Sequence, residues 1–243
     1  MIEDLELNIK NIPLVEQKSR EASLKKFVEK GFPNKRLEDW KFSDFNKIIH
    51  ENFKKININK IIDEVNAIDL IQDFEHNHIL LVNGKINSKN LKYEDEKNFQ
   101  ITEYKSGLIK KEETQNSLIN LNDALFEGGY FLEIFNEYKF KKPLIIYNYF
   151  YGDLKEKIIN NKNLIILNKN TDIDLIELNQ DVSKNNFIYN NYTSINISEK
   201  ASLKTYSVQG TKSEGFFYKF IKVNLKENST FEECIFSSGL KFN

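Results

Sequence analysis

The strand-rich second half of the chain repeats a side-chain pattern about every 30 residues, which restricts the folds it can adopt. The segment of residues 195–210 resembles the segment of residues 223–239, with the matched positions offset by 28. An earlier copy, with Thr171 and Ile173, aligns with Ala201 and Leu203 at an offset of 30. Each copy reads as a strand, a polar turn, a small residue and another strand. The pairs matched at the offset of 28 are Ile195/Val223, Asn196/Asn224, Ile197/Leu225, Glu199/Glu227, Ala201/Ser229 and Leu203/Phe231.

A period of this length in a region of strands predicts a solenoid, in which each repeat stacks on the next. We expect a parallel β-helix, because the copies preserve the side-chain pattern as well as the spacing. The alternative is an antiparallel sandwich with a strand about every 8–12 residues. The expected strands lie at residues 130–135, 143–150, 163–168, 173–178, 187–192, 194–197, 203–208, 216–225 and 231–236.

The first half of the chain has the periodicity of helices. Apolar residues at helical spacing predict helices at residues 14–30, from 43 or 44 to 53, near 59–68, and at 117–126. Residues 78–82 form a short β-rich run that ends in Asn83-Gly84, which is typical of a hairpin. The partner strand is residues 85–91 or 100–104, and the sequence leaves both open.

The charge balance excludes several classes of function. The chain has 35 Lys and Arg against 36 Asp and Glu, a net charge of −1, so no overall basic surplus favours nucleic acid or an anionic membrane. The aromatic residues Phe216, Phe217, Tyr218 and Phe220 fit a solenoid core better than a nucleic-acid platform. Neither a signal peptide nor an apolar run of about 18–20 residues is present, so we expect a cytoplasmic protein.

The sequence carries none of the common catalytic motifs. It has no phosphate-binding glycine loop of the GxxxxGK[ST] or GxGxxG type and no Gly-x-Ser-x-Gly motif. Glu232 and Glu233 are adjacent on a predicted strand, so their carboxylates point to opposite faces and cannot share a substrate. We therefore expect that the chain is not an enzyme.

Two groups of residues are candidate metal ligands. Cys234 is the single cysteine, so no disulfide can form within the chain, and it lies in a predicted strand. A buried cysteine that acts as a small apolar residue is the favoured interpretation, and the alternative is a cysteine that binds a metal or carries sulfide. His76 and His78 are two residues apart, which places both rings on one face of a strand. Only Glu75 lies nearby as a third ligand, so a surface position without metal is favoured.

Residues 31–45, GFPNKRLEDWKFSDF, resemble the N-terminal signature of the SufB/SufD family. In that signature a helix ends at Gly-x-Pro and is followed by Arg, an acidic residue, Trp-Lys and an aromatic residue. The matching positions here are Gly31, Pro33, Arg36, Glu38, Trp40, Lys41 and Phe42. The usual aromatic residue is Tyr, so Phe42 departs from the signature. Residues 80–85 and 121–150 also resemble the family, which extends the likeness along the chain.

The resemblance implies an α+β fold: an N-terminal helical region with a hairpin, then a right-handed parallel β-helix. We place the boundary between residues 1–115 and residues 116–243. Family members continue with further β-helix turns and C-terminal helices, so we expect this chain to be truncated before them. Arg36, Glu38 and Trp40 are expected to clamp the N-terminal region onto the solenoid, with partner binding as the alternative.

The resemblance also implies a role in iron–sulfur cluster assembly by the SUF system. The chain resembles SufD-type members more than SufB-type members, on its signature and its single cysteine. The expected role is a non-catalytic scaffold that pairs with a SufB-type subunit and a SufC-type ATPase, with a homodimer left open. We expect no firmly bound cofactor, because the complex handles the cluster. The alternatives are a SufB-like scaffold that holds the cluster and a β-helix interaction module unrelated to this process.

Overall fold

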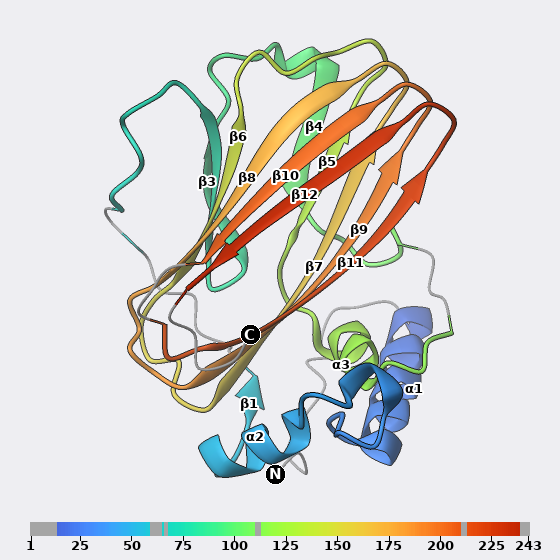
Figure 1. The fold of residues 1–243 in the computed structure, drawn as a ribbon, viewed down its shortest axis with the longest axis vertical. Helices are drawn as coiled ribbons and strands as arrows, with labels where there is room; N and C mark the ends of the chain where they lie inside the picture. Colours follow the sequence, from blue (N-terminus) through green and yellow to red (C-terminus); the bar gives the residue numbers. More distant parts are fainter. Residues whose placement is uncertain (1–13, 59–64, 66–67, 110–112, 210–212, 239–243) are drawn as a thin grey trace.

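The computed structural model describes residues 14–58, 65, 68–109, 113–209 and 213–238. Helices and short strands come first in the chain, and long strands follow (Figure 1). The helices are α1 (Leu14–Lys30), α2 (Phe45–Asn52) and α3 (Ser117–Leu125), with short 3-10 turns η1 (Glu38–Trp40) and η2 (Glu96–Asn98). Asp44 caps α2 by accepting a hydrogen bond from the Lys47 amide, which confirms the predicted start of that helix.

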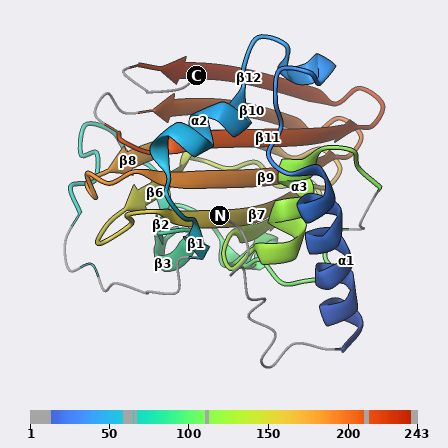
Figure 2. The same ribbon diagram turned by 90° about the horizontal axis from the view of Figure 1, so that it is seen from below.

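The strands form two sheets, each with six strands among the described residues. The first sheet has the order β11-β9-β7-β5-β4, with β1 beside β7, and the second has the order β12-β10-β8-β6-β2-β3. The chain alternates between the sheets from β5 onward, so each pair of strands makes one turn of a parallel solenoid (Figures 1 and 2). The first sheet contains β1 (Asn57–Ile58), β4 (Phe99–Glu103), β5 (Tyr130–Ile134), β7 (Lys157–Leu167), β9 (Phe187–Ile197) and β11 (Phe216–Leu225). The second contains β2 (Asn77–Val82), β3 (Lys85–Asn90), β6 (Leu144–Phe150), β8 (Asp172–Asp181), β10 (Ser202–Gln209) and β12 (Thr230–Ser237).

The register of the parallel strands reproduces the sequence repeat. Leu203 pairs with Ile173 on one side and with Phe231 on the other, which gives the two offsets found in the sequence. Ile195 likewise pairs with Val223. Residues matched in the sequence repeat are therefore hydrogen-bonded neighbours in the parallel ladders, and the alternative of an antiparallel sandwich is wrong. Antiparallel pairing occurs, within the described residues, only between β2 and β3 and between β4 and β5.

The turns that lead from the first sheet to the second share one backbone feature. Asn170, Lys200 and Asn228 occupy equivalent positions and have φ values of 56°, 58° and 56°. Asn adopts this left-handed conformation more readily than most residues, because its short polar side chain forms local hydrogen bonds. This geometry lets a chain poor in glycine make the same tight turn in three successive repeats.

The hairpin predicted at Asn83-Gly84 is confirmed, and its partner is β3. Both turn residues have positive φ, 49° and 87°, as a tight two-residue hairpin turn requires. The alternative partner pairs instead as β4 with β5. A Cβ on Gly84 would lie 2.0 Å from Oδ1 of Asn161, so the solenoid wall leaves no room there for a side chain.

Two expectations from the sequence differ from the structure. The strand expected at residues 163–168 begins earlier, at Lys157, and the strands expected at 187–192 and 194–197 form one strand, β9. The helix expected near residues 59–68 lies largely outside the described residues, and Val65 and Ile68, which are described, are not helical.

The helices lie outside the solenoid against the first sheet (Figure 2). Buried residues of α1, α2 and α3, among them Phe27, Phe45 and Leu121, join Ile188 and Phe216 of the sheet in one apolar cluster. The helices thereby bury the end of the outer face of the first sheet that contains Ile188 and Phe216. Among the helices in the described part of the chain, none is both long and apolar enough to cross a membrane.

Candidate functional site: a polar belt inside the solenoid

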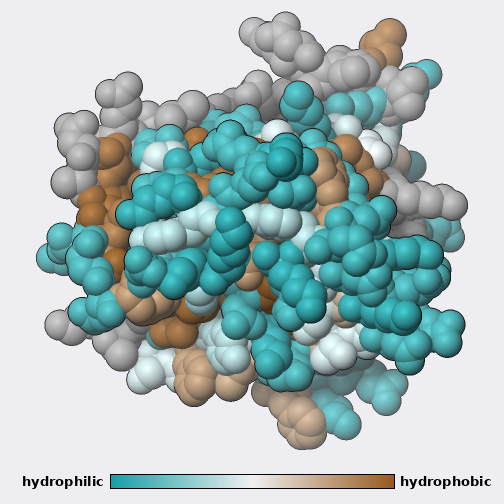
Figure 3. All heavy atoms as spheres, turned by 90° about the horizontal axis from the view of Figure 1, so that it is seen from above, coloured by the Kyte–Doolittle hydropathy of each residue, from teal (hydrophilic) through white to brown (hydrophobic). Residues whose placement is uncertain are grey.

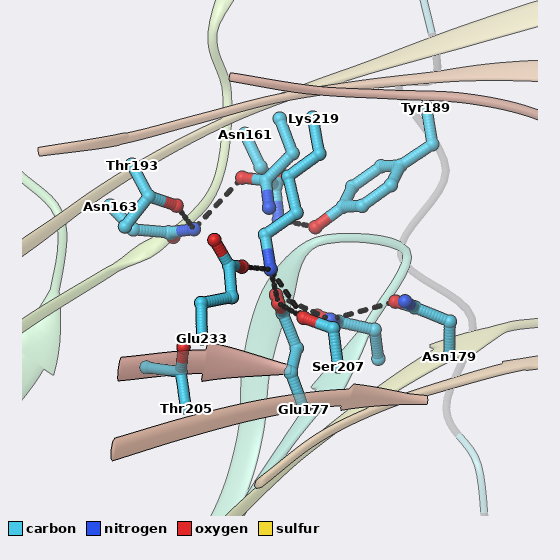
Figure 4. A network of polar contacts seen from close by, with 12 residues as sticks. Asn161, Asn163, Glu177, Asn179, Tyr189, Thr193, Thr205, Ser207, Lys219 and Glu233 are labelled. Atoms are coloured by element: carbon cyan, nitrogen blue, oxygen red, sulfur yellow. Dashed lines mark hydrogen bonds and ion pairs between the residues drawn. The ribbon is translucent and has the colours of Figure 1, made fainter. Parts of the chain in front are cut away.

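The interior of the solenoid contains a belt of polar side chains between two apolar regions. Along β9 the inward-facing residues change from Phe187 to Asn191 and Thr193, and then back to Ile195. The apolar regions on either side hold, among others, Phe187 and Phe217 at one end and Ile195 and Leu203 at the other. The residues of this polar belt are Asn148, Asn161, Asn163, Glu177, Asn179, Tyr189, Asn191, Thr193, Thr205, Ser207, Lys219 and Glu233 (Figure 4).

The charged centre of the belt joins the two sheets. Nζ of Lys219, on β11, lies 2.5 Å from Oε2 of Glu177, on β8. The same ammonium lies 2.5 Å from Oγ of Ser207 and 3.4 Å from Oε1 of Glu233. Figure 4 shows these acceptors gathered around the end of the lysine side chain. One cation from the first sheet is therefore held by three consecutive strands of the second.

Asparagine side chains form the rest of the belt by bonding along the ladders. Nδ2 of Asn163 donates to Oδ1 of Asn191 at 2.8 Å and to Oγ1 of Thr193 at 3.1 Å. Nδ2 of Asn148 donates to Oδ1 of Asn179 at 3.0 Å and to Oε1 of Glu177 at 3.3 Å. Stacked strands place equivalent polar side chains one above another, so amides of the belt bond to side chains in the next repeat.

The electrostatics of the belt keep the central pair ionised. Burial alone raises the pKa of Glu177, but the Lys219 charge and hydrogen bonds from Lys219, Ser207 and Asn148 outweigh it and hold that pKa below its usual value. For Lys219, burial lowers the pKa, and the carboxylates of Glu177 and Glu233 outweigh it, so the pKa is raised. Burial, and next the Glu177 charge, raise the pKa of Tyr189 well above its ordinary value.

This arrangement leaves the central groups without free reactive atoms. The three protons of the Lys219 ammonium match the three acceptors Glu177, Ser207 and Glu233. A lysine held in its charged form by two carboxylates is not a nucleophile. Nowhere in the described ranges do three His, Cys, Asp or Glu side chains gather in a way that could hold a metal ion. The central ion pairs of the belt therefore connect the two sheets.

Cys234 is exposed, so the expectation that it is buried was wrong. Alternate residues of β12 point in opposite directions, and Glu233 contacts Lys219 in the interior. Cys234, its neighbour, therefore points outward, next to Tyr206 of β10. The outward direction of Cys234 could have been predicted from the sequence repeat. Phe231 matches the inward-facing Leu203, and Cys234 lies three positions after Phe231, which places it on the opposite face of the strand.

His76, directly before β2, and His78, in β2, both contact the ring of Tyr147, and their own ring centroids lie 5.9 Å apart. Nδ1 of His76 donates to the Phe74 carbonyl oxygen at 3.0 Å, so Nε2 accepts from the Tyr147 hydroxyl at 3.3 Å. Burial, followed by the charges of His76 and Lys92, lowers the pKa of His78. These residues border a surface pocket of about 430 Å³, and Glu75 in its wall pairs with Lys142 at 2.6 Å.

Of the signature residues, Trp40 contacts the solenoid directly. Its ring stacks on Tyr218 of β11, with centroids 5.7 Å apart, and packs against Phe45 of α2 at 5.6 Å. Arg36 lies in the preceding loop and Glu38 begins η1; both are exposed, and the structure gives no ion pair between these two described residues. The contact between the N-terminal region and the solenoid at this point is thus aromatic.

Comparison with known families covers nearly the whole chain. Residues 6–146 match the family described as SufBD protein N-terminal region. Residues 150–243 match the family described as SUF system FeS cluster assembly, SufBD core domain. The chain belongs to the SufB/SufD family. Its role accordingly lies in iron–sulfur cluster assembly by the SUF system. No curated protein matches the chain.

The polar belt of this SufB/SufD protein was missed by the sequence reasoning. Its asparagines lie in stretches such as residues 160–163, Asn-Asn-Lys-Asn, which are typical of a loop. The spacing of these residues could have indicated the belt, because Asn161 and Asn163 pair with Asn191 and Thr193 one repeat later. Polar residues that recur at the repeat period indicate a ladder rather than a turn.

Proposed function

We propose that the chain is a SufD-type scaffold subunit that catalyses no reaction itself. In this proposal it pairs with a SufB-type subunit, works with a SufC-type ATPase and acts in the cytoplasm. It binds no cofactor firmly, and the iron–sulfur cluster is the cargo of the complex as a whole.

The observation that supports a scaffold role is the closed set of contacts around Lys219. The carboxylate of Glu177 binds the Lys219 ammonium and accepts hydrogen bonds from Ser207 and Asn148, so the charges of Glu177 and Lys219 neutralise each other. Iron–sulfur clusters are held mainly by cysteine thiolates. The single cysteine of this chain points outward from β12, away from the belt. These features favour a SufD-type over a SufB-type role.

Cluster reconstitution distinguishes the two types. The full gene product is incubated anaerobically with ferrous iron and sulfide, alone and together with the SufB-type protein of the same organism, and absorbance at the visible iron–sulfur bands is recorded. We expect the chromophore only when the SufB-type protein is present. A stable chromophore on this chain alone, lost in Cys234→Ser, would establish the SufB-like alternative.

A further inference from the structure

The outer face of the second sheet carries two apolar rows that run across its strands. Side chains on this face are alternate residues of each strand, and the register aligns them from strand to strand. The first row is Ile145, Ile176, Tyr206 and Cys234, and the second is Leu80, Tyr147, Leu178, Val208 and Phe236. We call these two rows the outer stripe.

One end of the outer stripe is covered by the chain itself. Val65, Ile68, Leu70 and Ile71 pack over the cluster of Leu80, Val82, Ile145 and Tyr147 at β2 and β6. The backbone amide of Ile71 donates to the Tyr147 hydroxyl at 3.1 Å, which fixes this cover in place. Residues 68–76, which we call the strap, contain no helix or strand, and β2 begins directly after them at Asn77. The chain thus already covers one end of this face with a segment that has no regular secondary structure.

The other end of the outer stripe, on β10 and β12, is exposed. The exposed fractions are 38% for Tyr206, 37% for Val208 and 56% for Phe236, and Cys234 is also exposed. In the view from above, apolar side chains gather on the left side of the molecule, where this face lies (Figure 3). A continuous exposed apolar patch of this kind marks an interaction surface.

The dimensions of the stripe favour a narrow occupant. Its two rows lie about 7 Å apart along the strands, and its exposed strands lie about 5 Å apart. On one side the stripe is bordered by a row of charged residues, Asp174, Lys204 and Glu232, which are paired across the ladder. A second sheet packed face to face would remove this charged row from water, which is unfavourable. An extended segment that crosses the strands covers only the apolar rows.

We propose that the exposed part of the outer stripe binds an extended apolar segment of a partner protein, which continues the line of the strap across β10 and β12. The partner segment carries branched apolar side chains at alternate positions, as the strap does with Ile68 and Leu70. Its polar side chains face Lys204 and the two acids beside it. This site does not depend on whether the subunit is of the SufD or the SufB type.

Binding at this site can be tested with a peptide from the chain's own sequence and a fluorophore on its own cysteine. The probe is a synthetic peptide with the sequence of residues 65–74, and the reporter is an environment-sensitive fluorophore attached to Cys234, the single cysteine. We expect a saturable blue shift with the peptide and none with a peptide that has Asp at the positions of Ile68, Leu70 and Ile71. Val208→Lys should weaken binding at least about tenfold, because a charge replaces an apolar contact.

The matched control is Ser202→Lys, on the same strand and face but outside the stripe, which should bind as the unaltered protein does. Circular dichroism verifies that both lysine variants fold, and Val208→Ser is a milder substitute if Val208→Lys does not. The proposal is overturned by the absence of saturable binding, or by equal binding to all the variants. It is also overturned in favour of a second copy if sedimentation shows a dimer of the chain that Val208→Lys dissociates.

Discussion

Lys219 and Glu177 meet inside the solenoid from opposite sheets, with Nζ 2.5 Å from Oε2. The two residues are 42 positions apart in the sequence, so the contact forms only when the repeats stack. A buried pair of this kind contributes little net stability over an apolar pair, but the loss of one partner leaves the other charge without compensation. The polar belt therefore makes the interior sensitive to single substitutions.

Lys219→Met should lower the free energy of unfolding by about 3 kcal/mol, because the Glu177 carboxylate would stay buried without its cation. Urea unfolding followed by circular dichroism measures the change. Lys204→Met, on the outer face of β10, is the control and should change stability by less than about 0.5 kcal/mol. The double variant with Glu177→Leu should regain part of the loss. A double variant no more stable than Lys219→Met would show that the pair is not coupled.

The same pair predicts a dependence of stability on pH. Folding lowers the pKa of Glu177 below its ordinary value of 4.5, so its stabilising contribution is present above that pH and is lost as the pH falls through the folded value. Folding raises the pKa of Lys219 above 10.5, so that contribution is present below this pH and is lost as the pH rises through the folded value. The stability advantage of the unaltered protein over Glu177→Gln should shrink in acid. An advantage that is constant across the acid range would contradict the assignment.

Trp40→Ala should destabilise the protein by about 2 kcal/mol, because it removes a half-buried indole and its stacking on Tyr218. Trp40 is the single tryptophan, so its fluorescence in the unaltered protein reports when the N-terminal region separates from the solenoid. The matched control is Phe42→Ala, two residues away, since that ring is 92% exposed and its loss should be nearly neutral. Equal effects of the two substitutions would mean that the aromatic contact does not hold the N-terminal region.

Gly84→Ala should be strongly destabilising, by more than about 3 kcal/mol, because the new Cβ would lie 2.0 Å from Oδ1 of Asn161 and the backbone has a φ of 87°. Gly107→Ala separates the two causes, because Gly107 has the same φ but no neighbouring atom within 4 Å of the position that a Cβ would occupy. It should cost only about 1 kcal/mol. Thermal unfolding compares the two variants, and similar losses would show that the close approach of Asn161 is unimportant.

The sequence predicted the ladder better than it predicted the contents of the solenoid. The sequence offset between Leu203 and Phe231 can be seen directly in the repeat, and it correctly predicts the register between β10 and β12 of the second sheet. The hairpin at Gly84 was equally local. Its partner could not be chosen from the sequence, because both candidate strands have suitable residues and the choice depends on β5 pairing with β4.

The interior could not be predicted in the same way because side-chain direction depends on where each strand begins. A strand predicted to start at Asn163 omits Asn161, whereas the true strand begins at Lys157 and directs both inward. Of the aromatic residues expected in the core, Phe217 lies inside, but Phe216 and Tyr218 lie outside under the helices and Phe220 stacks on Tyr192. Asn and Phe are poor guides to side-chain direction here because the helices also bury part of the outer face of the first sheet.

The most direct test of the scaffold account is anaerobic co-purification of the full gene product with the SufB-type and SufC-type proteins of the same organism, followed by cluster transfer to an apo-ferredoxin. The account predicts a stable complex that contains all three proteins, with cluster transfer that is retained when Cys234 is replaced by serine. If the chain fails to bind either protein, or if transfer is lost with Cys234→Ser, the proposal of a non-catalytic SufD-type scaffold is contradicted.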